Sequence, residues 1–254
     1  MTGTYAELEG RTVVVTGGSR GIGAHTARAF AAQGASVCVV GRDEAALAAV
    51  VEEIAGAGGE AMAASADVTD ARALDGVRRS VAERFGAVDV LAAFAGGQGF
   101  PVPTAELSEQ RWREVLDSDL TSVFLTVQAF LPGMLERGSG SVLTMSSAAG
   151  RQPSGANLAY GVANAGVVML TRHLAAELGP HGIRVNCLAP SAILTEKVQA
   201  RMPAEVQAKV AATHPLGRLG TPADVAEAAL FLSSDGAGWL TGLTVDVAGG
   251  RITN

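Results

Sequence analysis

Residues 12–16, Thr-Val-Val-Val-Thr, run directly into residues 17–23, Gly-Gly-Ser-Arg-Gly-Ile-Gly, and an alanine-rich stretch follows at 24–30. The β-branched run predicts a buried strand, and the stretch after the glycines predicts a helix. Glycines let a backbone turn tightly and approach a phosphate, and free N–H groups at a helix start attract its charge. This context favours a phosphate-binding loop over an ordinary turn. The candidate contacts are Gly17, Ser19, Arg20, Gly21, Ile22 and Gly23.

Short β-branched runs and longer alanine-rich stretches alternate along the rest of the chain. Repeated β–α–β units give this pattern, which predicts an α/β fold of the Rossmann type: a doubly wound parallel sheet of about seven strands, in three layers, forming one domain over 1–254. We expect strands near 12–17, 36–41, 60–66, 88–94, 140–146, 183–188 and 243–247. We expect helices near 22–33, 43–57, 71–85, 109–136, 156–179 and 222–234, with caps at Thr69 or Asp70, Ser108, and Thr221 before Pro222.

Residues 191–217 interrupt this alternation between the sixth strand and the last helix. A long insertion at the carboxyl end of a sheet strand often acts as a lid over a ligand. A pair of surface helices accounts for the segment equally well, so both interpretations stay open.

The composition excludes several classes of protein. Hydrophobic residues make up 48% of the 254 and aromatic residues only 4%, which suits a parallel sheet buried under alanine-rich helices. The net charge of −6 argues against a nucleic-acid partner, which needs clustered Lys and Arg. The start has no secretory-signal pattern, and no apolar run approaches the roughly 18 residues of a membrane span. We therefore expect a soluble cytoplasmic protein.

The cysteines and histidines give no sign of a metal site. Cys38 and Cys187 each lie in an apolar run, as buried thiols in a reducing compartment do. The four histidines lack ligand spacing, so each is expected to be a hydrogen-bonded or solvated side chain. They are His25, His173, His181 and His214.

The end of the second predicted strand bears on the choice of cofactor. A carboxylate there binds the ribose 2′-hydroxyl of NAD, whereas a nearby arginine accommodates the 2′-phosphate of NADP. Gly41 stands where the carboxylate is expected and Arg42 follows it, with Arg20 in the glycine loop as a second cation. Two guanidinium groups at one phosphate favour NADP(H). The alternative is that Arg42 is a solvated residue paired with Asp43 or Glu44.

Motifs further along complete a family pattern. Asp67-Val68 follows the third predicted strand, and Tyr160 lies thirteen residues after Ser147. Leu240-Thr241-Gly242 lies near the end of the chain. Together with the glycine loop, Pro190 and Thr195, these motifs make nearly the whole chain resemble the short-chain dehydrogenase/reductase family, which includes bacterial β-ketoacyl-carrier-protein reductases. The resemblance implies that Ser147 holds the substrate oxygen and that Tyr160 is the general acid or base. It implies cofactor contacts from Asp67 and Val68 at adenine, from Ile193 and Thr195 at the nicotinamide carboxamide, and from Ala95, Gly96, Tyr160, Asn164 and Pro190.

Four positions depart from the family pattern. The lysine expected four residues after Tyr160 is Asn164, and the asparagine expected in the central helix is Asp119. The family's Asn-Asn-Ala-Gly reads Ala-Phe-Ala-Gly at 93–96, and the glycine expected after Pro190 is Ser191. Lysine occurs only at positions 197 and 209, so no neighbour within the motif replaces the missing ammonium group.

These departures have chemical consequences. Without a neighbouring ammonium group, the pKa of Tyr160 is expected to stay near its ordinary value of about 10. Alcohol oxidation needs a base and suffers, whereas carbonyl reduction needs a proton donor, which a protonated tyrosine already is. Asn164 can give one neutral hydrogen bond to the nicotinamide ribose. If Asp119 faces Asn164, its carboxylate is expected to accept a hydrogen bond from that amide.

The leading functional prediction is an NADP(H)-dependent oxidoreductase that reduces a ketone or related carbonyl, with Tyr160 as proton donor. Apolar residues in the lid suit a fairly hydrophobic substrate; they are Ala192, Ile193, Leu194, Val198 and Met202. Two alternatives remain: a non-redox enzyme for proton transfer, dehydration or cyclisation, and a non-catalytic NADP(H)-binding subunit. The resemblance also implies a homotetramer or homodimer through the helices near 109–136 and 156–179 and the final strand.

Overall fold

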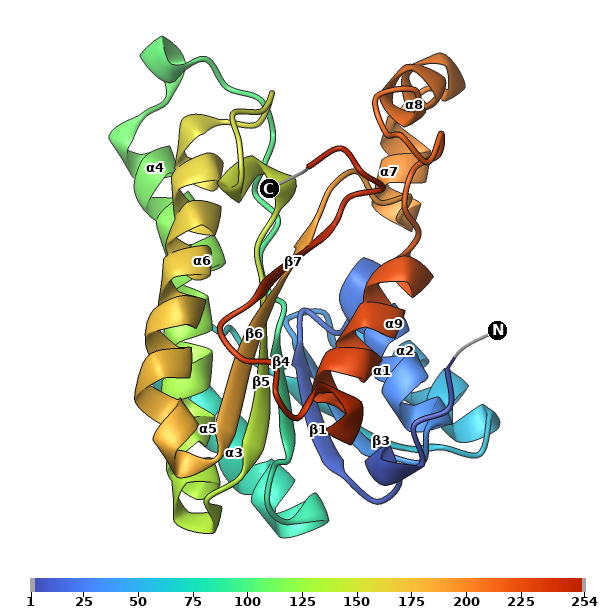
Figure 1. Ribbon diagram of the computed structural model, residues 1–254, viewed down its shortest axis with the longest axis vertical. Coiled ribbons are helices and arrows are strands. Elements are labelled where there is room, and N and C mark those ends of the chain that lie inside the picture. Colours follow the sequence, from blue (N-terminus) through green and yellow to red (C-terminus); the bar gives the residue numbers. More distant parts are fainter. Residues whose placement is uncertain (1–2, 253–254) are drawn as a thin grey trace.

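The computed structural model describes residues 3–252, and its centre is a seven-stranded, wholly parallel sheet (Figure 1). The strand order is β3-β2-β1-β4-β5-β6-β7, so the order reverses between β1 and β4. Ligands of open α/β sheets bind outside the carboxyl ends of the strands at such a reversal. The strands are β1 (Thr12–Thr16), β2 (Ser36–Gly41), β3 (Glu60–Ser65), β4 (Val90–Ala93), β5 (Gly140–Met145), β6 (Ile183–Pro190) and β7 (Thr244–Val247).

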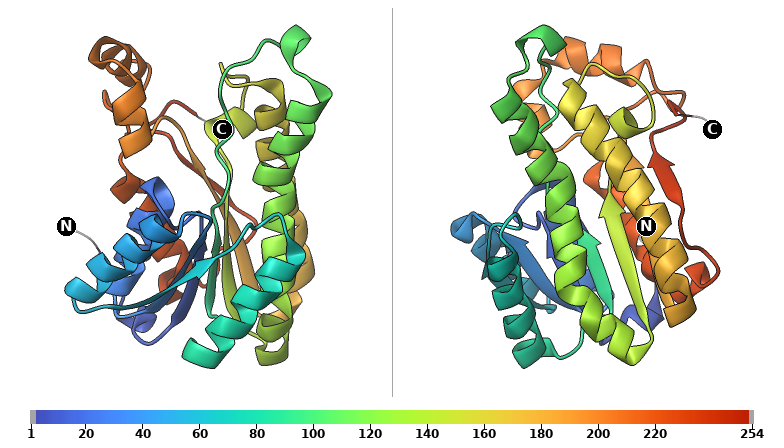
Figure 2. Two further views of the ribbon diagram at one scale, coloured as in Figure 1. Left: turned by 180° about the vertical axis from the view of Figure 1, so that it is seen from behind. Right: turned by 90° about the vertical axis from the view of Figure 1, so that its left-hand side faces the viewer.

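Helices cover both faces of the sheet and complete the three layers (Figure 2). Alternate residues of one strand enter opposite cores, as Val13 and Val14 do in β1. The α-helices are α1 (Gly21–Ala32), α2 (Glu44–Gly56), α3 (Ala71–Phe85), α4 (Glu109–Leu116), α5 (Ser122–Arg137), α6 (Leu158–Leu178), α7 (Glu196–Arg201), α8 (Ala204–Ala211) and α9 (Pro222–Ser233). Short 3₁₀ turns lie at Ala6–Leu8, Thr104–Glu106, Ala148–Gly150, Gly179–His181 and Asp235–Ala237.

The predicted Rossmann architecture is confirmed. With the exception of one helix, the predicted limits of the strands and helices agree with the structure to within about two residues. The caps also form as expected. Asp70, rather than Thr69, caps α3 by accepting a hydrogen bond from the Arg72 N–H, and Ser108 caps α4. Thr221 and Asp224 form a reciprocal capping box at the start of α9.

The single helix predicted near 109–136 is wrong in its middle. A π-helical turn, Asp117–Thr121, separates α4 from α5. Such a turn holds one residue more than an α-helical turn and therefore rotates the side chains around it. Asp119 lies in this turn and is only 4% exposed, because its carboxylate points inward to backbone N–H groups.

Residues 191–217 form the pair α7 and α8, which stands beyond the carboxyl ends of the strands (Figure 1). Both open interpretations describe it, since the segment is a helix pair and lies where a lid would. Its base is fixed by hydrogen bonds from the Leu194 N–H to the Gly220 carbonyl and from the Gly220 N–H to the Ala192 carbonyl. Within residues 3–252, no helix is long and apolar enough to cross a membrane.

Candidate active site

The glycine loop joins β1 to α1 and has room only for glycine at critical points. Gly17 has a φ of +68° and Gly21 a φ of +55°, which side-chain-bearing residues rarely adopt. A Cβ atom on Gly23 would lie 2.2 Å from the Gly17 carbonyl oxygen, so α1 packs directly on the loop. Arg20 precedes α1 without capping it, and its first turn has no acidic residue. The amino-terminal N–H groups of α1 are thus left for a ligand.

The two cations expected at the ribose phosphate each lie beside a different carboxylate. Arg20 pairs with Asp43, and an Arg42 guanidinium nitrogen lies 3.8 Å from an Asp67 oxygen. The expected alternative pairing of Arg42 with Asp43 or Glu44 is therefore wrong. The Arg42 side chain is 76% exposed, and exposed ion pairs contribute little stability, so the guanidinium can turn to a better anion.

The other predicted cofactor residues lie along the carboxyl edge of the sheet. Asp67 accepts hydrogen bonds from the backbone and hydroxyl of Thr69, and mainly these bonds lower the pKa of its carboxyl. Thr195 caps α7, and a Cβ atom on Gly21 would lie 3.3 Å from its methyl carbon, so the lid touches the glycine loop. Val68 follows Asp67, Ala95 and Gly96 follow β4, Pro190 ends β6, and Ile193 is buried at the base of the lid.

Tyr160 and Ser147 come together at this edge, from the first turn of α6 and the end of β5. Burial raises the pKa of Tyr160 above its ordinary value, and the Asp119 carboxylate adds to the rise. Hydrogen bonding to the Ser147 and Asn164 side chains opposes it only in part. The expectation of a nearly unperturbed pKa is therefore wrong, because it took no account of burial. Tyr160 is even more firmly protonated at neutral pH than the sequence suggested.

Asn164 and Asp119 do not form the expected hydrogen bond. The Asn164 amide group donates instead to the Tyr160 carbonyl oxygen, at 2.9 Å, one helical turn earlier in α6. Asn164 is 3% exposed, and its backbone carbonyl oxygen accepts a hydrogen bond from the Ser146 hydroxyl at 2.8 Å. The prediction failed because it placed both residues on regular helices, whereas the π-helical turn directs Asp119 elsewhere.

Asp119 holds the loop that follows β4. Its Oδ2 accepts from the N–H groups of Gly97 and Gln98, both at 3.1 Å, and its Oδ1 accepts from the Ser118 hydroxyl at 2.6 Å. Burial raises the pKa of Asp119, and these hydrogen bonds limit the rise. Asp119 therefore supports the candidate site indirectly, by fixing the backbone of the loop after β4.

Sequence reasoning missed Asn157, which holds the same loop from the other side. It is 1% exposed and caps α6 by accepting from the Tyr160 N–H. Its amide donates to the carbonyl oxygens of Gln98 and Phe100, both at 2.8 Å. Gly99 between them lies against the Tyr160 ring, since a Cβ atom there would be 3.0 Å from it. An asparagine at the start of the helix predicted near 156–179 was the available signal.

The comparisons with known proteins agree with this geometry. A family model described as enoyl-(acyl carrier protein) reductase matches residues 17–251. Cis-4-hydroxycyclohexanecarboxylate dehydrogenase of Sinomonas cyclohexanicum is 40% identical over 240 residues, which cover 94% of this chain and 96% of the relative. The chain belongs to the short-chain dehydrogenase/reductase family.

Two further members of the family are similar along almost their whole length. A 2,5-dichloro-2,5-cyclohexadiene-1,4-diol dehydrogenase of Sphingobium indicum is 34% identical over 243 residues, which cover 96% of each chain. A 3-oxoacyl-(acyl-carrier protein) reductase of Brucella melitensis, solved with bound NAD, has a TM-score of 0.89 and 36% identity, covering 98% of this chain and 94% of its own. This short-chain dehydrogenase/reductase is thus an oxidoreductase whose structural neighbours bind nicotinamide dinucleotides.

A cavity of about 250 Å³ lies between the lid and the end of β7 in this short-chain dehydrogenase/reductase. Ser191 and His214 meet there, with the Ser191 Oγ 3.0 Å from the His214 Nε2. The His214 Nδ1 lies 2.8 Å from the Val210 carbonyl oxygen, and the ring is 3% exposed. The prediction of a hydrogen-bonded histidine is confirmed here, and Ser191 fastens the end of β6 to the lid.

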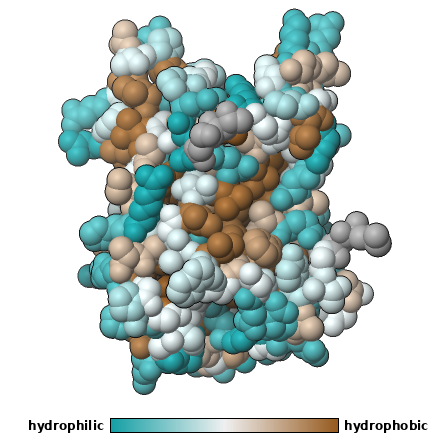
Figure 3. Space-filling view, in the orientation of Figure 1, coloured by the Kyte–Doolittle hydropathy of each residue, from teal (hydrophilic) through white to brown (hydrophobic). Residues whose placement is uncertain are grey.

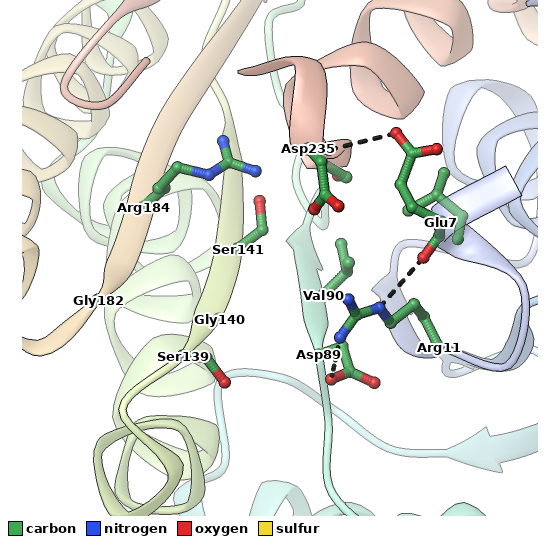
Figure 4. A pocket seen from close by; sticks show the side chains of 12 residues that line it. Glu7, Arg11, Asp89, Val90, Ser139, Gly140, Ser141, Gly182, Arg184 and Asp235 are labelled. Carbon is green, nitrogen blue, oxygen red and sulfur yellow. Dashed lines mark hydrogen bonds and ion pairs between the residues drawn. The ribbon is translucent and has the colours of Figure 1, made fainter. Parts of the chain in front are cut away.

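A second cavity, of about 160 Å³, lies at the opposite, amino-terminal edge of the sheet (Figure 4). The charged side chains that line it form hydrogen bonds and ion pairs with other groups of the protein. The Glu7 side chain accepts from the Asp235 N–H, and the Arg11 guanidinium bonds to the Glu7 carbonyl and to Asp89. The Arg184 guanidinium donates to three backbone carbonyls. These contacts fasten the amino-terminal segment to the sheet.

Proposed function

We propose that this protein is an NADP(H)-dependent reductase of a ketone or related carbonyl, with Tyr160 as the proton donor. One observation carries the proposal: Tyr160 stands beside Ser147 in an environment that raises the tyrosine pKa, with an amide, Asn164, where the family pattern has an ammonium group. A protonated phenol is the form that reduction consumes.

The glycine loop fits a dinucleotide. Side chains cap the amino ends of α2, α3, α4, α6, α7 and α9, whereas α1, like the lid helix α8, lacks such a cap. At the glycine loop this leaves the α1 N–H groups to a pyrophosphate. Gly41 at the end of β2 puts no carboxylate at the ribose, and Arg42 beside it supports the 2′-phosphate of NADP(H). When bound, the reduced nicotinamide supplies the hydride for the reaction.

The residues of the chain have divided tasks in this proposal. The Ser147 hydroxyl and the Tyr160 hydroxyl bind the carbonyl oxygen, and Tyr160 passes its proton to that oxygen as the alkoxide develops. Asn164 contributes a neutral hydrogen bond where an ammonium group would lower the tyrosine pKa. Asp119 and Asn157 act as positioning residues, because both hold the 97–100 loop against the Tyr160 ring. The arrangement favours reduction over alcohol oxidation.

Two relatives suggest the kind of substrate, since their names place the reacting hydroxyl on a six-membered carbon ring. The lid offers apolar surface of matching character, with Val198 and Met202 half-buried on and beside α7. We therefore propose a cyclic ketone with an apolar body as the substrate.

The test restores the ammonium group in Asn164→Lys and follows both directions of the reaction against pH. In the parent protein, ketone reduction should be flat through neutral pH and fall only above about pH 10, because the tyrosine pKa is raised. In the variant, the fall in the reduction rate with rising pH should begin at a lower pH than in the parent. The rate of alcohol oxidation at neutral pH should increase, since each unit of pKa lowering multiplies the tyrosinate fraction about tenfold.

Ala49→Lys on the exposed face of α2 makes the same change of charge far from Tyr160 and serves as the control. Unchanged profiles in Asn164→Lys would contradict the role given to position 164. NADPH binding without turnover of any cyclic ketone would favour the non-redox enzyme or the non-catalytic subunit.

We also propose that the protein forms a homo-oligomer. Large apolar side chains are exposed on the outer faces of α5 and α6 and next to β7, and Figure 3 shows an apolar patch in the middle of the face on which β7 lies. They include Phe124, Met169, Trp239 and Leu243, with Trp239 99% exposed. Burying such a patch favours association. Light scattering during size-exclusion chromatography measures the mass, and a monomer at micromolar concentration would contradict the proposal.

A further inference from the structure

Two cations of the lid meet one aromatic ring at the mouth of the candidate active site. The Lys197 Nζ lies 5.0 Å from the centre of the Phe100 ring, and the Arg201 guanidinium carbon lies 5.4 Å from it. Lys197 and Arg201 are four residues apart and therefore share one face of α7. The ring thus joins the lid to the loop after β4.

Phe100 is fixed with respect to the reacting groups. Its carbonyl oxygen accepts from the Asn157 amide, and the preceding residue, Gly99, lies against the Tyr160 ring. The cations that contact the Phe100 ring are therefore held close to the catalytic tyrosine by a short, well-anchored connection. A substrate whose carbonyl reaches Tyr160 would extend toward them.

Among the described residues, 3–252, the two cations have no carboxylate partner. Neither Lys197 nor Arg201 forms an ion pair anywhere in residues 3–252, although Glu196 and Glu205 lie close by in sequence. Like charges four residues apart on a helix repel each other, so this pair has a local cost. The chain as a whole carries a net charge of −6, whereas these two cations place two positive charges on one face of α7.

We propose that Lys197 and Arg201 form a binding subsite for a carboxylate group of the substrate, which makes the preferred substrate an apolar ketone acid. This inference rests on the proposed reductase function. The Phe100 ring, which is 48% exposed, contacts both cations where the carboxylate is expected to bind. The carboxylate can displace the ring, because a charge-assisted hydrogen bond is stronger than an exposed cation–π contact. The planar guanidinium group of Arg201 matches the two oxygens of a carboxylate, and the Lys197 ammonium group beside it adds a second donor.

The test measures binding and turnover separately. Cyclohexanecarboxylate and cyclohexanecarboxamide have no ketone to reduce, so calorimetry on the NADPH complex reports the subsite alone. We expect the acid to bind about 10- to 100-fold more tightly than the amide, with the advantage lost in K197M/R201M and reduced by salt. In turnover, 4-oxocyclohexanecarboxylate should exceed its methyl ester in kcat/KM by a similar factor, and the double variant should affect only the acid.

Lys209→Met provides the matched control, because it removes the only other lysine of the chain. Lys209 lies on α8 and is not among the cations that lie over the Phe100 ring. Equal binding of acid and amide, or an acid preference that survives the double variant, would overturn the inference. Selective binding of the acid without reduction of either ketone would uphold the subsite and refute the reductase function instead.

Discussion

The glycine loop, residues 17–23, and the group formed by Ser147, Tyr160 and Asn164 both lie at the carboxyl edge of the sheet, but different forces hold them in place. Backbone atoms build the loop, where a Cβ atom on Gly23 would lie 2.2 Å from the Gly17 carbonyl oxygen. Side chains build the catalytic group, through hydrogen bonds such as Asn164 to Tyr160.

This difference explains why Asn164 and Asp119 fit at their positions. A backbone-built site tolerates almost no added atom, because protein interiors are close-packed. A site built from side chains accepts another residue wherever the newcomer satisfies the same polar neighbours. Asn164 and Asp119 do so, since the amide bonds to a helix carbonyl and the carboxylate accepts two backbone N–H groups. The glycine loop therefore keeps the pattern that the sequence resembles, whereas positions 164 and 119 accept residues of another kind.

The most severe test of the backbone-built side is Gly23→Ala. The added methyl group forces α1 away from the loop, and overpacking of this kind costs about 3 kcal/mol of the free energy of unfolding. We expect a much lower Tm and complete loss of NADPH binding, measured by thermal unfolding and fluorescence titration. Gly76→Ala is the control, because nothing lies near that position of α3 and alanine favours a helix. Equal stability of both variants would refute the comparison.

On the side-chain-built half, Tyr160→Phe should remove turnover and leave the fold intact. Loss of a general acid lowers the rate about 10²- to 10⁴-fold. NADPH affinity and the Tm should change little, since the ring that supports Gly99 remains. Steady-state reduction of a cyclic ketone gives the rate, and activity within a few-fold of the parent would exclude Tyr160 as the proton donor.

Arg42→Ser tests a determinant of the nucleotide side that is a side chain rather than backbone. Charge-assisted bonds to a phosphate are worth about 1.5–3 kcal/mol, so the Kd for NADPH should rise about 10- to 100-fold while that for NADH stays the same. Arg72→Ser removes an equal charge from α3 and should alter neither affinity. A parent protein that binds NADH as tightly as NADPH would contradict the proposed cofactor.

The smallest effect concerns Asp119→Asn. The folded protein raises the pKa of this carboxyl, so its contribution to stability is fully present below the ordinary pKa of about 3.9 and declines as the pH rises through the folded-state value. The variant should therefore have a slightly higher Tm than the parent at neutral pH and an equal one near pH 3. Asp117→Asn, at an exposed position of the same turn, should show no such trend. A lower Tm in D119N at neutral pH would contradict the sign.

Much of the fold could be predicted, because its signals are local. The β-branched runs, the glycines after β1 and residues such as Ser108 and Thr221 mark elements within a few neighbouring positions. The spacing from Ser147 to Tyr160 likewise predicted a catalytic pair by resemblance, and the two side chains lie within hydrogen-bond reach of each other. The expectations that failed involve contacts between segments far apart in sequence. Arg42 meets Asp67 rather than its neighbours, and Asp119 bonds to Gly97 and Gln98 rather than to Asn164.

The sequence by itself determined the parallel sheet, the tight glycine loop before α1 and the absence of a lysine four residues after Tyr160, since residue type and spacing are sufficient for each. Only the tertiary structure decided that burial raises the tyrosine pKa, that a π-helical turn directs Asp119 to a loop, and that Lys197 and Arg201 meet at Phe100. The physical reason is that burial, charge proximity and hydrogen-bond partners depend on distances between chain segments, which residue spacing does not specify.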